Sequence, residues 1–260
     1  MTLDLAYTDT GVESARQTVV FLGSLGSSRA MWDPQVTELS ATGFRAVALD
    51  LRGHGESAVP PGPYTVADLA GDVLHSLDGL GLDSVHLVGL SLGGAVAQQI
   101  ALTASDRVAT LTLLCTSSRF GEPQPWLDRA STVRVSGTSS IVDAVVDRWF
   151  TRELADSDIG LVDRARAMVS DTDDEGYAAC CEALAAWDSR GDLHRITAPT
   201  LVIAGAQDPA TPPEHLQVIA ELIPGCRIEI LDPGAHLVNL EEPGRVSALI
   251  SAHIATPAHP

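Results

Sequence analysis

The sequence predicts one α/β domain with a mostly parallel central sheet, flanked by helices and interrupted by a helical insertion before its last strands. Three observations support this fold class. Short apolar segments alternate with helix-like segments over the first 118 residues, as in repeated strand–helix–strand units. From about residue 119 to 195 strand-like segments are missing, and apolar residues recur at helical spacing. Strand-like segments then return, so the sheet is completed after the insertion.

The predicted strands are short, rich in aliphatic and β-branched residues, and bounded by Gly, Ser or Asp. Four of them precede the insertion and two follow it, at 18–22, 45–50, 84–88, 109–115, 200–204 and 227–231. Continuous apolar segments of this length are typical of strands that are buried on both faces of a parallel sheet.

The helix-like segments lie between these strands and within the insertion. They are 65–79, 92 to about 104, 141–150, 154–168, 177–187 and 245–254. Thr65 is the expected N-cap of the first, because a hydroxyl just before an apolar periodic segment can accept from a free backbone amide. We therefore divide the chain into a core, 1–118 and 196–260, and a helical cap, 119–195.

The charge of the chain excludes several classes of protein. Its formal net charge of -18 disfavours nucleic acid and anionic membranes, which both bind basic surfaces. All 16 basic residues are Arg, so a Schiff-base lysine and a P-loop lysine are excluded. A negatively charged substrate would need a local Arg to overcome the repulsion of the surrounding acidic groups.

The sequence predicts a cytoplasmic protein without cofactors. Its cysteines are scattered without a paired motif and are expected to be reduced thiols, at Cys115, Cys180, Cys181 and Cys226. No signal peptide and no apolar segment of the ~20 residues that span a bilayer are present. No His, Asp or Glu cluster has metal-ligand spacing. Nothing in the sequence specifies an oligomeric state.

The segment Gly-Leu-Ser-Leu-Gly-Gly at 89–94 predicts a nucleophile. It matches G-x-S-x-G between a predicted strand and a predicted helix, which is the context of a nucleophile elbow. The turn is sharp, so the flanking positions need residues without bulky side chains. An ordinary strand–helix turn is the alternative, which the flanking strand, the helix and the third glycine disfavour. Ser91 is therefore the predicted nucleophile.

A serine hydroxyl needs a histidine to take its proton and a carboxylate to orient that histidine. Asp208 follows the predicted strand 200–204, and His236 follows the strand 227–231. Their order along the chain, after Ser91, is the order of enzymes with this elbow. Because the carboxyl ends of parallel strands meet at one edge, we expect these three residues to form a catalytic triad.

One further acidic residue and seven further histidines are alternatives for these roles. Asp232 shares a short loop with His236 and is interpreted as a turn residue, and His54, which precedes the nucleophile, is interpreted as structural. Surface or core positions are expected for the remaining histidines, His75, His86, His194, His215, His253 and His259.

An oxyanion hole needs two backbone amides aimed at the developing negative charge. The amide of Leu92, next to the nucleophile, is the first candidate. The second is the amide of Leu25, in the loop Gly-Ser-Leu-Gly at 23–26 that follows the first predicted strand.

With these residues in place, the sequence resembles the α/β-hydrolase superfamily along its full length, and more narrowly the 3-oxoadipate enol-lactonases. Many superfamily members carry His-Gly where this chain has Gly23-Ser24, whereas the enol-lactonases share its Ser-Leu-Gly. Besides the elbow, the matching segments are Gly-Ser-Leu-Gly at 23–26, Arg-Gly-His-Gly at 52–55, Pro-Gly-Pro-Tyr-Thr at 61–65, Leu-Cys at 114–115 through Arg-Phe-Gly at 119–121, Arg-Trp-Phe-Thr at 148–151, Asp-Pro-Ala-Thr-Pro-Pro at 208–213, and Ala-His-Leu-Val-Asn at 235–239 with Glu-Pro at 242–243.

The resemblance implies an α/β-hydrolase fold and a small anionic substrate, a five-membered enol-lactone that is opened to 3-oxoadipate in aromatic-acid catabolism. Arg119 is the candidate for the substrate carboxylate, because it follows the strand 109–115 and opens the cap; a solvated loop arginine is the alternative. Trp126 and Trp149 are candidates to cover the site, with the interior of the cap as their alternative position.

Two other functions fit the same motifs. A carboxylesterase or a C–C bond hydrolase would use the same triad on another substrate. A non-catalytic binding protein of this fold is the alternative from a different class, which the presence of Ser91, Asp208 and His236 disfavours.

Overall fold

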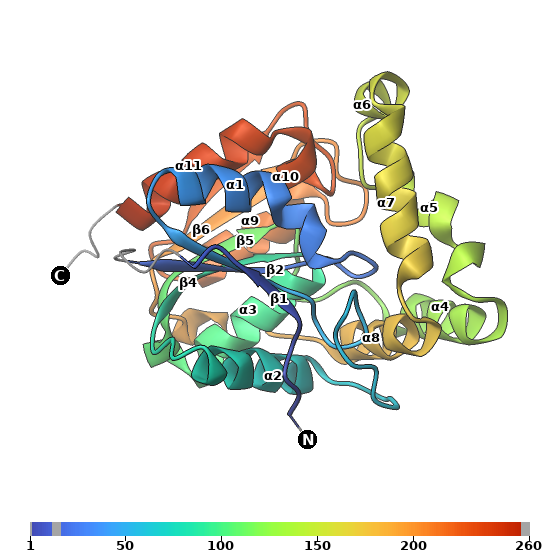
Figure 1. Cartoon of the computed structure of the whole chain (residues 1–260), viewed down its shortest axis with the longest axis horizontal. Helices are drawn as coiled ribbons and strands as arrows, with labels where there is room; N and C mark the ends of the chain where they lie inside the picture. The colour runs from blue at the N-terminus through green and yellow to red at the C-terminus, as the bar shows by residue number, and fades with distance from the viewer. Residues whose placement is uncertain (1, 12–16, 256–260) are drawn as a thin grey trace.

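The computed structural model describes residues 2–11 and 17–255, and in this part of the chain seven strands form a single sheet (Figure 1). The strand order is β1-β3-β2-β4-β5-β6-β7, and β1 runs antiparallel to β3 while the other neighbours are parallel. The bounds are β1 (Tyr7–Asp9), β2 (Thr18–Leu22), β3 (Arg45–Leu49), β4 (Val85–Leu90), β5 (Val108–Leu114), β6 (Thr200–Gly205) and β7 (Arg227–Leu231). The predicted fold class is confirmed.

Helices cover both faces of the sheet. One face packs against α1 (Asp33–Ala41) and α11 (Pro243–Ala255), with the short α10 (Val238–Glu241) beside them. The other face packs against α2 (Val66–Gly79), α3 (Leu92–Thr103) and α9 (Pro213–Leu222). Successive side chains of β2 enter opposite hydrophobic clusters, so this strand is buried on both faces, as its continuous apolar sequence predicts.

The predicted strands agree with the structure to within two residues at either end. The strands at 18–22 and 227–231 match, and β4 continues two residues further than predicted, to Leu90. The elbow therefore follows β4 without a linker. The three-residue β1 was not predicted, because it is too short to show a periodic pattern and is held by its antiparallel pairing with β3.

The predicted N-cap of α2 is confirmed. The Thr65 side chain accepts from the amide of Asp68 at 3.1 Å, and the Asp68 carboxylate accepts from the amide of Thr65 at 2.9 Å. This reciprocal pair satisfies two backbone groups at the start of the helix.

The chain between β5 and β6 contains helices without strands, as predicted. They are α4 (Pro123–Ser136), α5 (Val142–Val146), α6 (Arg152–Ser157), α7 (Ile159–Asp171) and α8 (Asp174–Ala186). The helix predicted at 154–168 is divided, because the Asp158 side chain accepts from the amide of Leu161 at 2.9 Å and starts α7 anew. Figure 1 shows α4 to α7 standing to one side of the sheet.

No helix in the described ranges is long and apolar enough to cross a membrane.

Candidate active site

Ser91 lies in the turn between β4 and α3 with a backbone φ of 55° and ψ of −113°. Few residues other than glycine adopt a positive φ, so the turn holds Ser91 in a strained conformation. The flanking glycines allow this turn to pack closely. A Cβ on Gly93 would lie 2.2 Å from the carbonyl oxygen of Leu22, and one on Gly89 would lie 2.3 Å from the carbonyl oxygen of Gly93. The need for glycine on both sides of the serine is therefore explained.

His236 and Asp208 are in direct contact. Nδ1 of His236 lies 2.8 Å from Oδ2 of Asp208, and both side chains are buried. Asp208 follows β6, and His236 follows β7. Because Asp208 engages Nδ1, Nε2 is the ring nitrogen left for another partner, and Ser91 lines the same pocket as His236.

Asp208 also accepts hydrogen bonds from the turn that follows it. Its Oδ1 accepts from the amides of Ala210 and Thr211 at 2.8 Å and 3.0 Å, and its Oδ2 accepts from the hydroxyl of Thr211 at 2.7 Å. Burial alone would raise the pKa of Asp208, but the charge of His236 and the hydrogen bonds from His236 and Thr211 lower it to about 2. Asp208 is therefore ionised at neutral pH.

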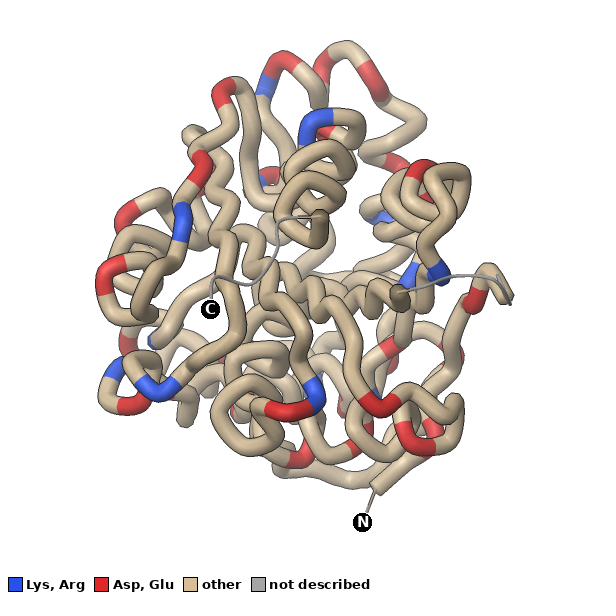
Figure 2. Tube along the Cα trace, turned by 90° about the vertical axis from the view of Figure 1, so that its left-hand side faces the viewer, with Lys and Arg blue, Asp and Glu red and all other residues tan. Residues whose placement is uncertain are grey.

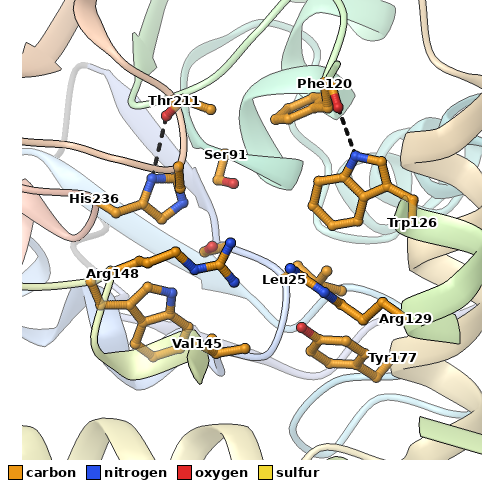
Figure 3. A pocket seen from close by; sticks show the side chains of 13 residues that line it. Leu25, Ser91, Phe120, Trp126, Arg129, Val145, Arg148, Tyr177, Thr211 and His236 are labelled. Carbon is orange, nitrogen blue, oxygen red and sulfur yellow. Dashed lines mark hydrogen bonds between the residues drawn. The ribbon is translucent and has the colours of Figure 1, made fainter. Parts of the chain in front are cut away.

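Thr211 was not predicted as a site residue. Its hydroxyl also lies 3.3 Å from Nδ1 of His236 (Figure 3). The signal for it was the turn Asp-Pro-Ala-Thr, where a hydroxyl three residues after a carboxylate can fold back onto it.

The two predicted oxyanion amides both lie near Ser91. Leu92 begins α3, and Leu25 lies in the loop after β2 and lines the pocket. Among the hydrogen bonds of the described residues, none is donated by the backbone amide of Leu25 or of Leu92. Two free donors next to a nucleophile suit a developing oxyanion.

The pocket around Ser91 is formed by the core on one side and the cap on the other (Figure 3). The core contributes the loop at residues 23–26 (the oxyanion loop), the serine, the histidine and the turn after Asp208. The helices α4, α5 and α8 and the segment after α5 close the opposite side. Its lining residues are Ser24, Leu25, Ser91, Phe120, Trp126, Arg129, Val145, Arg148, Trp149, Tyr177, Ala210, Thr211 and His236.

Of the three substrate-binding residues predicted from sequence, the two tryptophans line this pocket and Arg119 does not. The Arg119 guanidinium instead pairs with Glu122 at 3.0 Å on the outside of the cap. Trp126 donates to the carbonyl of Phe120 at 2.7 Å and packs edge-on against its ring. Trp149 also packs in a buried hydrophobic cluster, so it both lines the pocket and belongs to the interior of the cap.

Two arginines that were not predicted, Arg129 on α4 and Arg148 after α5, line the pocket (Figure 3). Neither forms an ion pair with a carboxylate of the described residues. Burial lowers the pKa of Arg148, and the charge of Arg129 lowers it further. Two guanidinium groups that repel each other in one pocket would be stabilised by a bound anion.

The competing residues lie elsewhere. Asp232 is exposed, and His54 is buried beneath the oxyanion loop. None of the other described histidines lines the pocket, and His259 lies outside the described residues. No group of three or more potential metal ligands occurs within residues 2–11 and 17–255.

Comparison with known proteins assigns this fold and site to a class. The model of the "Alpha/beta hydrolase family" matches residues 19–249, so the chain belongs to the α/β-hydrolase family. Within it, the chain is 35% identical to 3-oxoadipate enol-lactonase 2 of Acinetobacter baylyi, over 92% of this chain and 89% of the relative. The resemblance to enol-lactonases seen in the sequence is thereby confirmed.

Solved structures support the same placement. The enol-lactonase from Burkholderia xenovorans superposes with a TM-score of 0.94 at 35% identity, covering 98% of this chain and 97% of that one. A thermophilic esterase from Thermogutta terrifontis superposes with a TM-score of 0.91 at 32% identity, covering 98% and 95%. The chain is a hydrolase of this family, and it is similar over nearly its whole length to both an enol-lactonase and an esterase.

Proposed function

We propose that this hydrolase opens the lactone ring of 3-oxoadipate enol-lactone to give 3-oxoadipate. The single observation that supports this substrate is a pocket in which Arg129 and Arg148, both without a carboxylate partner, lie with Ser91 and His236. The similarity to enol-lactonases over more than nine-tenths of the chain supports the ring-opening reaction.

In the first half of the proposed reaction, Nε2 of His236 takes the hydroxyl proton of Ser91, and Oγ attacks the lactone carbonyl carbon. The amides of Leu25 and Leu92 donate to the resulting oxyanion. The ring C–O bond then breaks, and the enol oxygen leaves as part of the same molecule, which stays esterified to Ser91. An enolate is a stable leaving group, so little protonation by His236 is needed at this step.

In the second half, the proton that His236 took from Ser91 is transferred to the carbon of the enolate, which becomes the ketone and leaves His236 neutral. His236 then takes a proton from a water molecule, whose oxygen attacks the ester carbonyl carbon. Collapse of the second tetrahedral intermediate releases the new carboxylate and returns the proton from His236 to Ser91. Asp208, ionised at neutral pH, keeps Nδ1 of His236 protonated throughout.

The net negative charge of the molecule makes two arginines in the pocket important for binding an anionic substrate. Acidic positions are spread over the face shown in Figure 2 rather than gathered in one patch, and the formal net charge is -18. An anionic substrate meets a repulsive field until it reaches the pocket. A guanidinium donates two parallel hydrogen bonds to a carboxylate, so Arg129 and Arg148 are suited to hold the acetate arm of the lactone.

The proposal is tested by comparing enzymatically generated enol-lactone with a neutral aryl acetate. For Arg129→Met and Arg148→Met we expect KM for the lactone to rise on the order of 10- to 100-fold, since a hydrogen bond to a charged group contributes about 1.5 to 3 kcal/mol. The kinetic constants for the aryl acetate should stay within about twofold, because that substrate has no carboxylate.

Arg119→Met is the matched control. It removes an arginine of the same cap that pairs with Glu122 and does not line the pocket, so lactone kinetics should be those of the unchanged protein. Preference of the unchanged protein for the aryl acetate by a wide margin would reject the enol-lactone as substrate.

A general carboxylesterase is the second candidate, favoured by the similarity to the Thermogutta terrifontis esterase. It predicts that simple esters are turned over as fast as the lactone, and that the two pocket arginines have no effect on KM for either substrate. The same set of variants therefore separates the two functions.

A further inference from the structure

His54 is a buried histidine of the core with no part in the proposed proton transfers. Its side chain lies beneath the oxyanion loop at 2% exposure, and the backbone amide of Gly26 donates to its Nε2 at 3.0 Å. On the other side of the ring, Nδ1 lies 3.1 Å from the carbonyl oxygen of Arg52. An amide can only donate, so Nε2 accepts, and Nδ1 carries the proton and donates to Arg52. The contacts thus select one neutral tautomer.

From these contacts we infer that His54 is a positioning residue, which orients the Leu25 amide in the oxyanion hole through the backbone of Gly26. This inference rests on the proposed acyl transfer at Ser91, and it assigns a role to a residue interpreted from sequence as structural only.

The loop needs such an anchor because Leu25 lies in a tight turn. The carbonyl oxygen of Ser24 accepts from the amide and the hydroxyl of Ser27 at 3.1 Å and 2.8 Å, and Gly26 has a φ of 78°. In a planar trans peptide the C=O and N–H point in opposite directions. The Ser24 carbonyl therefore turns the Leu25 amide away from Ser27, while the next peptide is fixed by the Gly26–His54 bond.

The anchor also sets the spacing of the two oxyanion donors. The start of the loop is joined to α3 where the amide of Gly93 donates to the carbonyl of Gly23 at 3.0 Å. His54 holds the far side of the turn, so the loop is prevented from tilting relative to the first turn of α3, which presents Leu92. Electrostatic stabilisation of an oxyanion depends on donors that are already oriented.

His54 is itself held rigidly. Its amide donates to the carbonyl of Leu51 at 3.0 Å, and the Arg52 guanidinium donates to Asp72 of α2 at 2.5 Å and 2.7 Å. Burial lowers the pKa of His54, although the Arg52 carbonyl and the charge of Asp50 act in the opposite direction. The ring therefore stays neutral near pH 7, as acceptance of the Gly26 bond requires.

The test uses the full chain and two variants of His54, with an aryl acetate and the enol-lactone as substrates. For His54→Leu we expect kcat to fall on the order of 10- to 100-fold with KM unchanged, because a misaligned oxyanion donor weakens transition-state stabilisation only. The affinity for a trifluoromethyl ketone, whose adduct with Ser91 carries an oxyanion, should fall by a similar factor. His54→Gln, whose Oε1 can accept from Gly26, should restore most of both losses.

His86→Leu is the matched control. His86 is a buried histidine on β4 whose Nδ1 lies 2.9 Å from Thr110, away from the pocket. The His86→Leu variant should have a lower midpoint of thermal unfolding, with kcat and the affinity for the ketone unchanged. It therefore separates a loss of stability from a loss of positioning.

Hydrogen exchange of the unchanged protein keeps the inference testable if His54→Leu does not fold. The Gly26 amide should be protected, and an unprotected amide there would overturn the inference. Wild-type kcat and ketone affinity in a folded His54→Leu would overturn it as well while leaving acyl transfer at Ser91 intact. Hydrolysis that persists in Ser91→Ala would instead reject the proposed function, and the role of His54 with it.

Discussion

The carboxylate of Asp208 shows how a single residue can be kept charged inside the protein. Four donors surround it, two on each oxygen: the amides of Ala210 and Thr211 on Oδ1, and the Thr211 hydroxyl and His236 on Oδ2. Its pKa of about 2 lies below the ordinary 3.8, so the unfolded chain takes up a proton at this residue before the folded protein does. The stability that these contacts contribute is therefore present above pH 4 and is lost as the pH falls towards 2.

Thr211→Val removes one of these donors with little change in shape. We expect the free energy of unfolding at pH 7 to fall by about 2 kcal/mol, as for a hydrogen bond to a charged group. The difference in the free energy of unfolding between the variant and the unchanged protein should narrow as the pH falls towards 2, since Asp208 then protonates in both. The value of kcat/KM should fall about tenfold, because His236 loses its orientation. Urea unfolding at pH 7 and pH 3 and steady-state kinetics measure these effects.

The control for this change is Thr200→Val, which removes an equally buried hydroxyl that donates to the neutral carbonyl of Ala198. Its loss of stability should be smaller and independent of pH. A pH-independent difference for Thr211→Val as well would contradict the role assigned to its hydroxyl.

At the scale of elements, the site depends on how closely α3 approaches the end of β2. The first turn of α3 lies on the carbonyl of Leu22, where a Cβ on Gly93 would lie at 2.2 Å. Backbone cannot move aside as a flexible side chain can, so this approach requires glycine. The approach also brings the N-terminus of α3 to the loop at residues 23–26, where the amide of Gly93 donates to the carbonyl of Gly23.

Gly93→Ala should therefore lower the free energy of unfolding by about 3 kcal/mol or more and abolish activity, because α3 must shift away from β2. Gly79→Ala, at the last residue of α2 where an added Cβ meets nothing within 4 Å, should be neutral or stabilise by about 0.5 to 1 kcal/mol. Thermal and urea unfolding compare the two. Equal stability of the two variants would contradict the packing argument.

Across the whole molecule, two opposite effects of pH act on stability. Repulsion among the acidic groups weakens as the pH falls from 7 towards the isoelectric point of about 4.6. Burial lowers the pKa values of His54, His86 and His253 below 6.5, that of His86 to about 4. The unfolded chain binds protons at these residues first, so their contribution to stability is present above pH 6.5 and is lost as the pH falls.

His86→Asn isolates the contribution of one buried histidine to the pH dependence of stability, because Asn can keep a hydrogen bond to Thr110 but cannot take up a proton. Between pH 7 and pH 4 we expect the variant to lose less stability than the unchanged protein. The acidic surface groups are the same in both proteins, so their effect on stability cancels in the difference. The measurement is urea unfolding at several pH values. A parallel pH dependence in both proteins would show that His86 is not a buried neutral group.

The central sheet, the helical insertion, the sharp turn at Ser91 and the positions of Asp208 and His236 after strand ends could all be predicted from the amino-acid sequence. These features are local, because a glycine that permits a sharp turn or a strand that ends in a polar loop can be recognised from neighbouring residues. The division of the cap at Asp158 and the short β1 were missed, since a capping bond and an edge pairing decided them.

Which residues face the pocket could not be predicted from the sequence and depends on how the chain packs. Arg119, Arg129 and Arg148 all belong to the cap in the sequence, yet Arg119 pairs with Glu122 while the other two enter the site. His54 likewise contacts a loop that lies 28 residues earlier in the chain, where the amide of Gly26 donates to its Nε2. The physical reason is that the direction of a side chain depends on the packing of helices and loops that are distant in the chain, and no local pattern records that packing.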